Sequence, residues 1–277
     1  MISLLIPSIL VRFLEYELRP DQIQDFKTKI NRLLDGQVEE FHNHIAGSEQ
    51  TRLGYPYIQY RSIKTLMQND LGDKRNFHLA ALFGVADGVD LILDLLNQIY
   101  HTGKPESLYH FEVEEYQTPV MMTETPQKYK INHWLPLNTI FRKEENQKTD
   151  NYEKWKTEMK MTGRISFLEG IVAGHIKDFC SEIGFRIPDR QLTVSLLDYR
   201  TLGKIKYPNN DHHEVKYEAF DVIYEANIQL PEYLGMGKGK SKGFGWQTRT
   251  EHHQLIDPQR LRDYQAQKQQ KSWRRSR

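Results

Sequence analysis

The sequence predicts an α+β protein made of two tandem ferredoxin-like (RRM-like) domains, with a glycine-rich loop in its C-terminal part. Three observations lead to this prediction. Strand-like and helix-like hydrophobic periods alternate through the first half in the order β-α-β-β-(β)-α-β, the split βαβ plan of a ferredoxin-like domain. The second half repeats this order of elements without repeating the residues. A segment rich in glycine and lysine, residues 234–245, then precedes a last short strand.

The first half contains two amphipathic helical patterns between strand-like runs. Pro20 and Asp21 can open a helix whose apolar residues keep a 3.6-residue period as far as Gly36. A second helix is predicted over residues 86–99. The predicted strands are residues 9–18, 38–45, 57–63, 78–83 and 109–116.

The second half begins after a stretch with prolines and threonines, residues 118–127, that is typical of a linker. A strand over 129–137, a charged connection over 138–151 and a long helix ending near Gly184 follow. Further strands are predicted over 191–199 and 216–229 and after the glycine segment. The expected division is a first domain over 1–122, a second domain over 123–257 and a basic polar tail over 258–277.

The composition is that of a globular chain. Of 277 residues, 38% are hydrophobic and 27% are charged. No apolar run approaches the roughly 18 residues of a membrane span, and the first residues lack the features of a signal peptide. The single cysteine, Cys180, excludes an intrachain disulfide. These features predict a cytoplasmic protein.

The net charge of +1 hides an asymmetry along the chain. Residues 234–277 hold 11 Lys and Arg against 3 Asp and Glu, whereas the preceding 233 residues hold 27 against 34. A basic C-terminal part on an acidic body is typical of a protein that binds a polyanion.

Residues 234–245, named here the glycine-rich loop, indicate which polyanion. Exposed N–H groups ringed by ammonium groups can receive phosphate. A nucleotide P-loop is disfavoured, because its first glycine would fall at Leu234 and a strand-like segment follows the loop. A short match to the RNP1 signature at Lys242–Gly245 also indicates RNA or single-stranded nucleic acid. The residues expected to bind are Gly235, Gly237, Lys238, Gly239, Lys240, Lys242, Gly243, Phe244 and Gly245.

Several segments resemble one family. The run from Ala219 through the glycine-rich loop is similar to the C-terminal loop of the CRISPR-associated RAMP endoribonucleases of the sixth Cas family. The resemblance is nearest to the branch found in methanogens and Bacteroidetes-type bacteria. It is carried further by residues 40–44 (EFHNH), 55–61 (YPYIQYR), 133–138 (HWLPLN) and 163–170 (GRISFLEG), and it spans most of residues 38–245.

The resemblance implies an enzyme that cuts CRISPR precursor RNA within its repeats without a metal ion or cofactor. The products would carry a 2′,3′-cyclic phosphate and a 5′-hydroxyl. It also implies RNA held between two ferredoxin-like domains, with catalytic roles for His42 and His44 and an assisting role for Tyr55. The implied partners are the repeat RNA and subunits of a CRISPR effector complex. Dimers occur in such a family, and no residue pattern here indicates one.

The residues are consistent with that chemistry. Histidine can act as base or acid near neutral pH, and two histidines at positions i and i+2 of a strand share a face. No third ligand at a usual spacing completes a metal site with His42 and His44. The family branch often has a lysine before this pair, where this chain offers Arg32, Lys29 or Arg52 to stabilise the transition state. Arg32, Arg52 and Arg249 are also expected to contact RNA.

Two alternatives stay open at this point. One is a RAMP subunit that binds guide RNA without cutting it, and the other is a nucleotide-binding protein that uses the glycine-rich loop. Three further side chains are predicted to be structural: His175 as a buried, hydrogen-bonded residue, and Trp134 and Trp155 as core residues.

Overall fold

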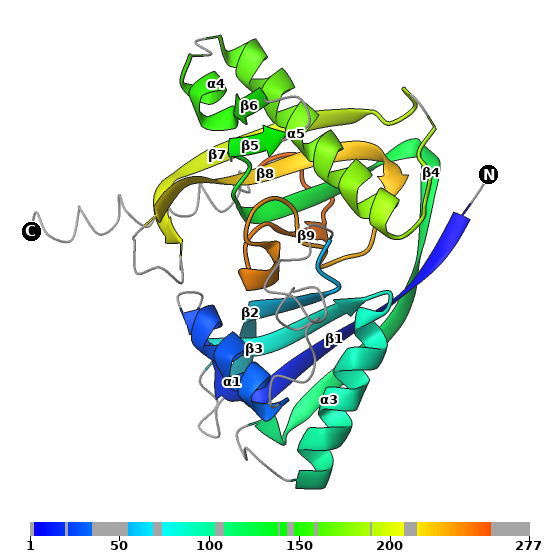
Figure 1. The fold of residues 1–277 in the computed structure, drawn as a ribbon, viewed down its shortest axis with the longest axis vertical. Helices are drawn as coiled ribbons and strands as arrows, with labels where there is room; N and C mark the ends of the chain where they lie inside the picture. The colour runs from blue at the N-terminus through cyan, green and yellow to red at the C-terminus, as the bar shows by residue number, and fades with distance from the viewer. Residues whose placement is uncertain are drawn as a thin grey trace, which may run out of the picture.

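The computed structural model describes residues 3–19, 22–34, 55–68, 74–102, 108–137, 139–142, 147–157, 160–188, 190–207 and 215–255. The chain forms two α+β halves, one above the other in Figure 1. Nine strands and four α-helices are described. In chain order they are β1 Ser3–Glu17, α1 Ile23–Leu33, β2 Ile58–Gln68, β3 Lys74–Val85, α3 Gly88–Thr102, β4 Phe111–Trp134, β5 Thr139–Arg142, β6 Gln147–Asp150, α4 Asn151–Thr157, α5 Met161–Glu182, β7 Val194–Tyr207, β8 Val215–Gln229 and β9 Trp246–Arg249, with a 3-10 turn, η4, at Lys240–Lys242. The short strands β5 and β6 make a separate two-stranded sheet.

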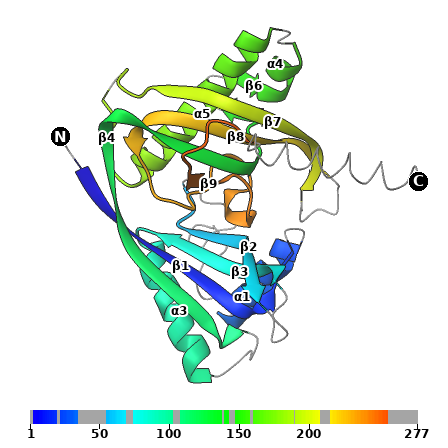
Figure 2. The same ribbon diagram turned by 180° about the vertical axis from the view of Figure 1, so that it is seen from behind.

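One antiparallel sheet runs through both halves in the order β2-β3-β1-β4-β8-β7, with β9 paired to β4. The first part of β4 pairs with β1, from Phe13 opposite Phe111 to Ser3 opposite Met121. Its second part lies between β8 and β9, so that Tyr129 is opposite both Tyr224 and Arg249. Figure 2 shows β4 passing from the lower half into the upper half. The strand orders β2-β3-β1-β4 and β7-β8-β4-β9 are those of two ferredoxin-like units that share one long strand.

The helical periods predicted for the first half are confirmed. Helix α1 buries Ile23, Phe26 and Ile30, and α3 buries one face that includes Ile92 and Ile99. Both faces join a core with the apolar residues of β1, β2 and β3. In the second half, α5 buries a stripe that joins β4 and β8 in a second core; the stripe is Leu168, Val172, Ile176 and Phe179.

Two predictions for the middle of the chain are wrong. Residues 118–127 are not a linker but the centre of β4, where Val120 is fully buried and Pro119 lies opposite Leu5 of β1. Proline costs one backbone donor, but its fixed φ is compatible with extended backbone. The charged connection over 138–151 contains the hairpin of β5 and β6. The expected boundary between residues 122 and 123 falls inside β4.

The strand predicted over 38–45 and the tail over 258–277 lie outside the described residues. Among the helices that the structure describes, none is long and apolar enough to cross a membrane.

Candidate functional site

The glycine-rich loop leaves β8 through a short turn and returns as β9. Its two ends are held together by backbone hydrogen bonds from Met236 N to Gly245 O, 2.7 Å, and from Gln247 N to Leu234 O, 2.9 Å. Between these ends the chain forms η4, which lies between the two halves of the molecule, drawn in orange in Figure 1. The loop therefore occupies the junction of the two units.

The glycines of this loop are required mainly by the protein itself. Gly245 has φ +64°, and a Cβ there would overlap the carbonyl of Met236. Gly243 has φ +87°, and a Cβ there would overlap the side chain of Ile23 on α1. Only glycine adopts such a conformation without strain at so close an approach. The expectation that these glycines open the backbone to a ligand is thus incomplete, since Gly245 lets the loop close on itself and Gly243 lets it pack on α1 of the first half.

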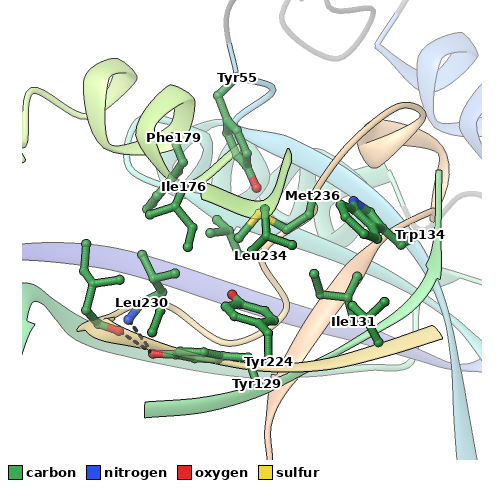
Figure 3. Packing of buried hydrophobic residues seen from close by; sticks show 14 of the residues in the cluster. Tyr55, Tyr129, Ile131, Trp134, Ile176, Phe179, Tyr224, Leu230, Leu234 and Met236 are labelled. Carbon is green, nitrogen blue, oxygen red and sulfur yellow. Dashed lines mark hydrogen bonds between the residues drawn. The ribbon is translucent and has the colours of Figure 1, made fainter. Parts of the chain in front are cut away.

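Apolar loop residues anchor the loop in the core. Leu234 and Met236 are buried, and Figure 3 shows them between Tyr224 on one side and Tyr55 with Trp134 on the other. Tyr55 packs edge-on against Phe179 of α5, with ring centroids 5.0 Å apart. Residues of the first half, the loop and α5 thus share one cluster.

Three polar side chains from residues 55–61 hold the loop and are named here the clamp: Tyr55, Gln59 and Arg61. Tyr55 donates to the carbonyl of Gly235, 2.9 Å, and accepts from Gln59 Nε2, 2.7 Å. Arg61 donates to Lys240 O, 2.8 Å, and to Tyr233 O, 3.3 Å, and its Nη2 also contacts Gln59 Oε1. Burial raises the pKa of Tyr55 and lowers the pKa of Arg61 to about 10.

Three lysines of the loop and one of α1 form the lysine cluster: Lys238, Lys240, Lys242 and Lys27. The ammonium groups of Lys240 and Lys238 lie 4.5 Å from the ring centres of Tyr55 and Tyr217 respectively. Burial, and then the charge of Lys242, lower the pKa of Lys27 to about 8. Burial also lowers the pKa of Lys240 and of Lys242. Partial burial of like charges is costly, and for Lys240 the carboxylates of Asp178 and Glu182 offset part of that cost.

Comparison with sequence models of known protein families shows to which family this chain belongs. A sequence model of the Cas6b N-terminal domain matches residues 6–118, and a model of the Cas6b C-terminal domain matches residues 121–250. The chain belongs to the Cas6b family. The two family domains meet between residues 118 and 121, in the middle of β4.

Individual proteins are also similar to this chain. The protein MJ0978 of Methanocaldococcus jannaschii is 31% identical over 125 residues, which are 45% of this chain and 73% of that protein. A crystal structure of Cas6b matches with a TM-score of 0.67 at 18% identity, over 89% of this chain and all of that one. A second structure, described as the CRISPR RNA processing endoribonuclease Cas6b, matches with a TM-score of 0.59 at 18% identity and the same coverage. At these identities the structures show a shared fold.

Several predicted site residues of this Cas6b chain lie outside the described part. These are His42, His44 and Arg52. Among the residues that the structure describes, no group of three or more His, Cys, Asp and Glu side chains could hold a metal ion.

Tyr55 is described, and its setting differs from the one expected for an assisting catalytic group. It is 3% exposed, and its hydroxyl is occupied by Gly235 and Gln59. The hydroxyl therefore binds the loop backbone, because α5 and the loop pack around the tyrosine and bury it.

Two arginines of the predicted site are described, and they lie on different elements, α1 and β9. Arg32 lies exposed in the last turn of α1. Arg249 is exposed at the end of β9 and lines a cleft of about 570 Å³ with Glu114, Glu115 and Glu232. Carboxylates are unfavourable neighbours for an RNA phosphate, although Glu114 is paired with Arg12, and contact of Arg249 with RNA stays a prediction.

The sequence did not identify Gln59, Arg61 or Lys27 as site residues. Gln59 and Arg61 lie within residues 55–61, one of the segments that carry the family resemblance, and that resemblance could have indicated them. Trp134 and Trp155 are core residues as predicted. His175 packs edge-on against Trp134, with ring centroids 5.8 Å apart, but its buried Nδ1 has no hydrogen-bond partner among the described residues. Burial, and then Lys240, lower its pKa to about 3.

Proposed function

We propose that this Cas6b chain is a metal-independent endoribonuclease that cuts CRISPR precursor RNA within each repeat and so produces guide RNAs. The observation that carries the proposal is the match of both Cas6b domain models, which together span residues 6–250 apart from two positions. The structural relative named as a CRISPR RNA processing endoribonuclease is consistent with it.

The glycine-rich loop would bind the RNA backbone. Three loop lysines and Lys27 gather positive charge at the junction of the two ferredoxin-like units. An RNA backbone supplies one negative phosphate per nucleotide, and lysine contacts to it release counterions. Affinity for repeat RNA is therefore expected to fall steeply as salt rises.

The cleavage would be an internal transesterification. One histidine removes the proton from a ribose 2′-hydroxyl, and the 2′-oxygen then attacks the adjacent phosphorus. The bond to the 5′-oxygen breaks, and a second histidine gives that oxygen a proton, which leaves a 2′,3′-cyclic phosphate and a 5′-hydroxyl. On the resemblance, we assign these two roles to His42 and His44. We assign Tyr55 to positioning the loop, because its hydroxyl is buried against Gly235.

The test is to incubate the chain with the CRISPR repeat RNA of the same genome in the presence of EDTA and to determine the product ends. Cleavage to a cyclic phosphate and a 5′-hydroxyl is expected. His44→Ala should abolish cleavage while changing repeat affinity by less than about threefold, because general acid–base groups act on the reacting bond. A requirement for divalent metal, or full cleavage by the variant, would refute the mechanism.

A repeat with a 2′-deoxyribose at the cleavage site supplies the second control. The proposed enzyme should bind this RNA and leave it intact. If the unmodified repeat is bound equally well and is never cut, the chain is instead a RAMP subunit that holds guide RNA.

A further inference from the structure

Arg61 is an unusual residue because its guanidinium is buried without a carboxylate. The side chain is 1% exposed, and no described carboxylate forms an ion pair with it. Its recorded acceptors are neutral oxygens: the carbonyls of Tyr60, Tyr233 and Lys240 and the side-chain oxygen of Gln59. A buried charge of this kind is costly, so the neutral oxygens that accept its hydrogen bonds have to stabilise it.

The carbonyl oxygens that accept from Arg61 belong to segments far from it in the sequence. Tyr233 immediately precedes the glycine-rich loop, and Lys240 begins η4 in its middle. The carbonyls of Tyr233 and Lys240 are 172 and 179 residues from Arg61 in sequence, whereas the arginine lies on β2 of the first half. One planar side chain therefore joins the base of the loop, the turn of the loop and the first unit.

The loop is also shaped to lie on this side chain. A Cβ on Gly235 would be 2.8 Å from Gln59 Oε1 and 2.9 Å from Arg61 Nη2, closer than such contacts occur. Gly235 thus lets the loop backbone rest on the clamp. Tyr55 completes the arrangement, since it binds both Gln59 and the carbonyl of Gly235.

Arginine suits this task better than lysine. Its fork presents several N–H donors in fixed directions, so that one rigid group can serve carbonyls on different segments. A lysine would keep the charge but place its donors on a single nitrogen. The pairing of carbonyls with Arg61 also sets the conformation of the backbone that carries Lys238, Lys240 and Lys242.

We propose that Arg61 is the positioning residue that holds the glycine-rich loop in its RNA-binding conformation, acting through Gln59 and the carbonyls of Tyr233 and Lys240. The RNA part of this inference rests on the proposed function. The loop-holding part does not require any RNA.

The test compares Arg61→Lys and Arg61→Gln with the unaltered chain by amide hydrogen exchange and by repeat-RNA titration. Both variants are expected to speed exchange of residues 234–245 at least about tenfold, while the amides of α3 and β1 stay protected. Repeat affinity should fall about tenfold, which corresponds to about 1.4 kcal/mol. The cleavage rate at saturating RNA should change less than about threefold, because the reacting groups are untouched.

A matched control separates the clamp from a general effect of losing an arginine. Arg200→Lys alters an arginine on β7 that pairs with Asp221, and it should leave loop exchange unchanged. Equal loop exchange in the Arg61 variants and the unaltered chain would overturn the proposal. So would loss of the saturated rate with unaltered affinity, which would place Arg61 in the chemistry.

A second variant keeps the buried charge and displaces the loop instead. Gly235→Ala puts a methyl group against Gln59 and Arg61 and should give the same fast loop exchange. Gly170→Ala is its control, because a Cβ at that position on α5 meets nothing within 4 Å. If Arg61→Gln fails to fold, unchanged loop exchange in Gly235→Ala overturns the proposal. If the unaltered chain neither binds nor cuts repeat RNA, the proposed function fails while the exchange results still decide the clamp.

Discussion

The hydroxyl of Tyr55 donates a hydrogen bond to the carbonyl oxygen of Gly235 across 180 residues of sequence, with 2.9 Å between the two oxygens. This bond joins the first ferredoxin-like unit to the glycine-rich loop of the second. The same hydroxyl accepts from Gln59 Nε2, so that it both donates and accepts inside the protein. The tyrosine of the family motif is therefore part of what fixes the loop in place.

Tyr55→Phe should lower stability rather than remove the chemistry. The change leaves a buried carbonyl and a buried amide N–H without their partner, which costs about 1–3 kcal/mol. Urea unfolding measures this loss, and Tyr100→Phe is a suitable control because that side chain is 64% exposed. Unchanged stability together with a cleavage rate reduced by more than a hundredfold would instead place Tyr55 in the reaction.

Lys27 should make stability depend on pH in the alkaline range. It is 8% exposed, and its pKa is lowered from 10.5 to about 8, first by burial and then by Lys242. Between pH 8 and 10.5 the unfolded chain therefore holds a proton that the folded chain has released. Stability should rise with pH across this window, by on the order of 2 kcal/mol, and be independent of this group below pH 8.

The measurement is the free energy of unfolding at pH 7.5 and pH 10 for the unaltered chain and for Lys27→Met. The difference between the two proteins isolates Lys27 from other groups that titrate in the same range. Parallel curves would show that the lysine is solvated in the folded chain.

The loop lysines should account for part of the salt dependence of RNA binding. Replacing Lys238, Lys240 and Lys242 together by alanine removes up to three phosphate contacts. For single-stranded RNA the slope of log affinity against log salt should become shallower by about 0.7 per lost contact, hence by about 2. Titration of repeat RNA at several salt concentrations measures this slope.

Lys154→Ala is the control for that experiment, since this lysine is exposed on α4 and lies outside the lysine cluster. A slope that the triple substitution leaves unchanged would place the RNA backbone on another surface.

Cys180 should report unfolding. It is the only cysteine of the chain, is 1% exposed, and burial raises the pKa of its thiol to about 12. Because only the thiolate reacts quickly, a disulfide reagent at pH 8 should modify the folded chain at least about a hundredfold more slowly than the chain in urea. One thiol per chain should react after unfolding. Rapid modification in native buffer would show that the end of α5 opens locally.

Much of the architecture followed from local pattern. The apolar periods of α1, α3 and α5 and the strands around them were predictable, because burial of one face leaves a regular spacing in the sequence. The prediction of a linker over residues 118–127 was wrong, because Pro119 and its neighbours are typical of loops. In the structure, pairing with β1 up to Met121 and with β8 from Met121 onward keeps this segment extended.

The sequence alone determined that the chain is α+β, that a basic glycine-rich loop follows β8, and which family its motifs resemble. Tertiary structure decided what those residues do. Arg61 and Tyr55 of the first unit meet Gly235 and Lys240 of the loop only once β4 has joined the two units in one sheet and α5 has packed over the junction. Spacing along a chain records the face on which a residue lies, but not which distant backbone carbonyl will come to rest against it.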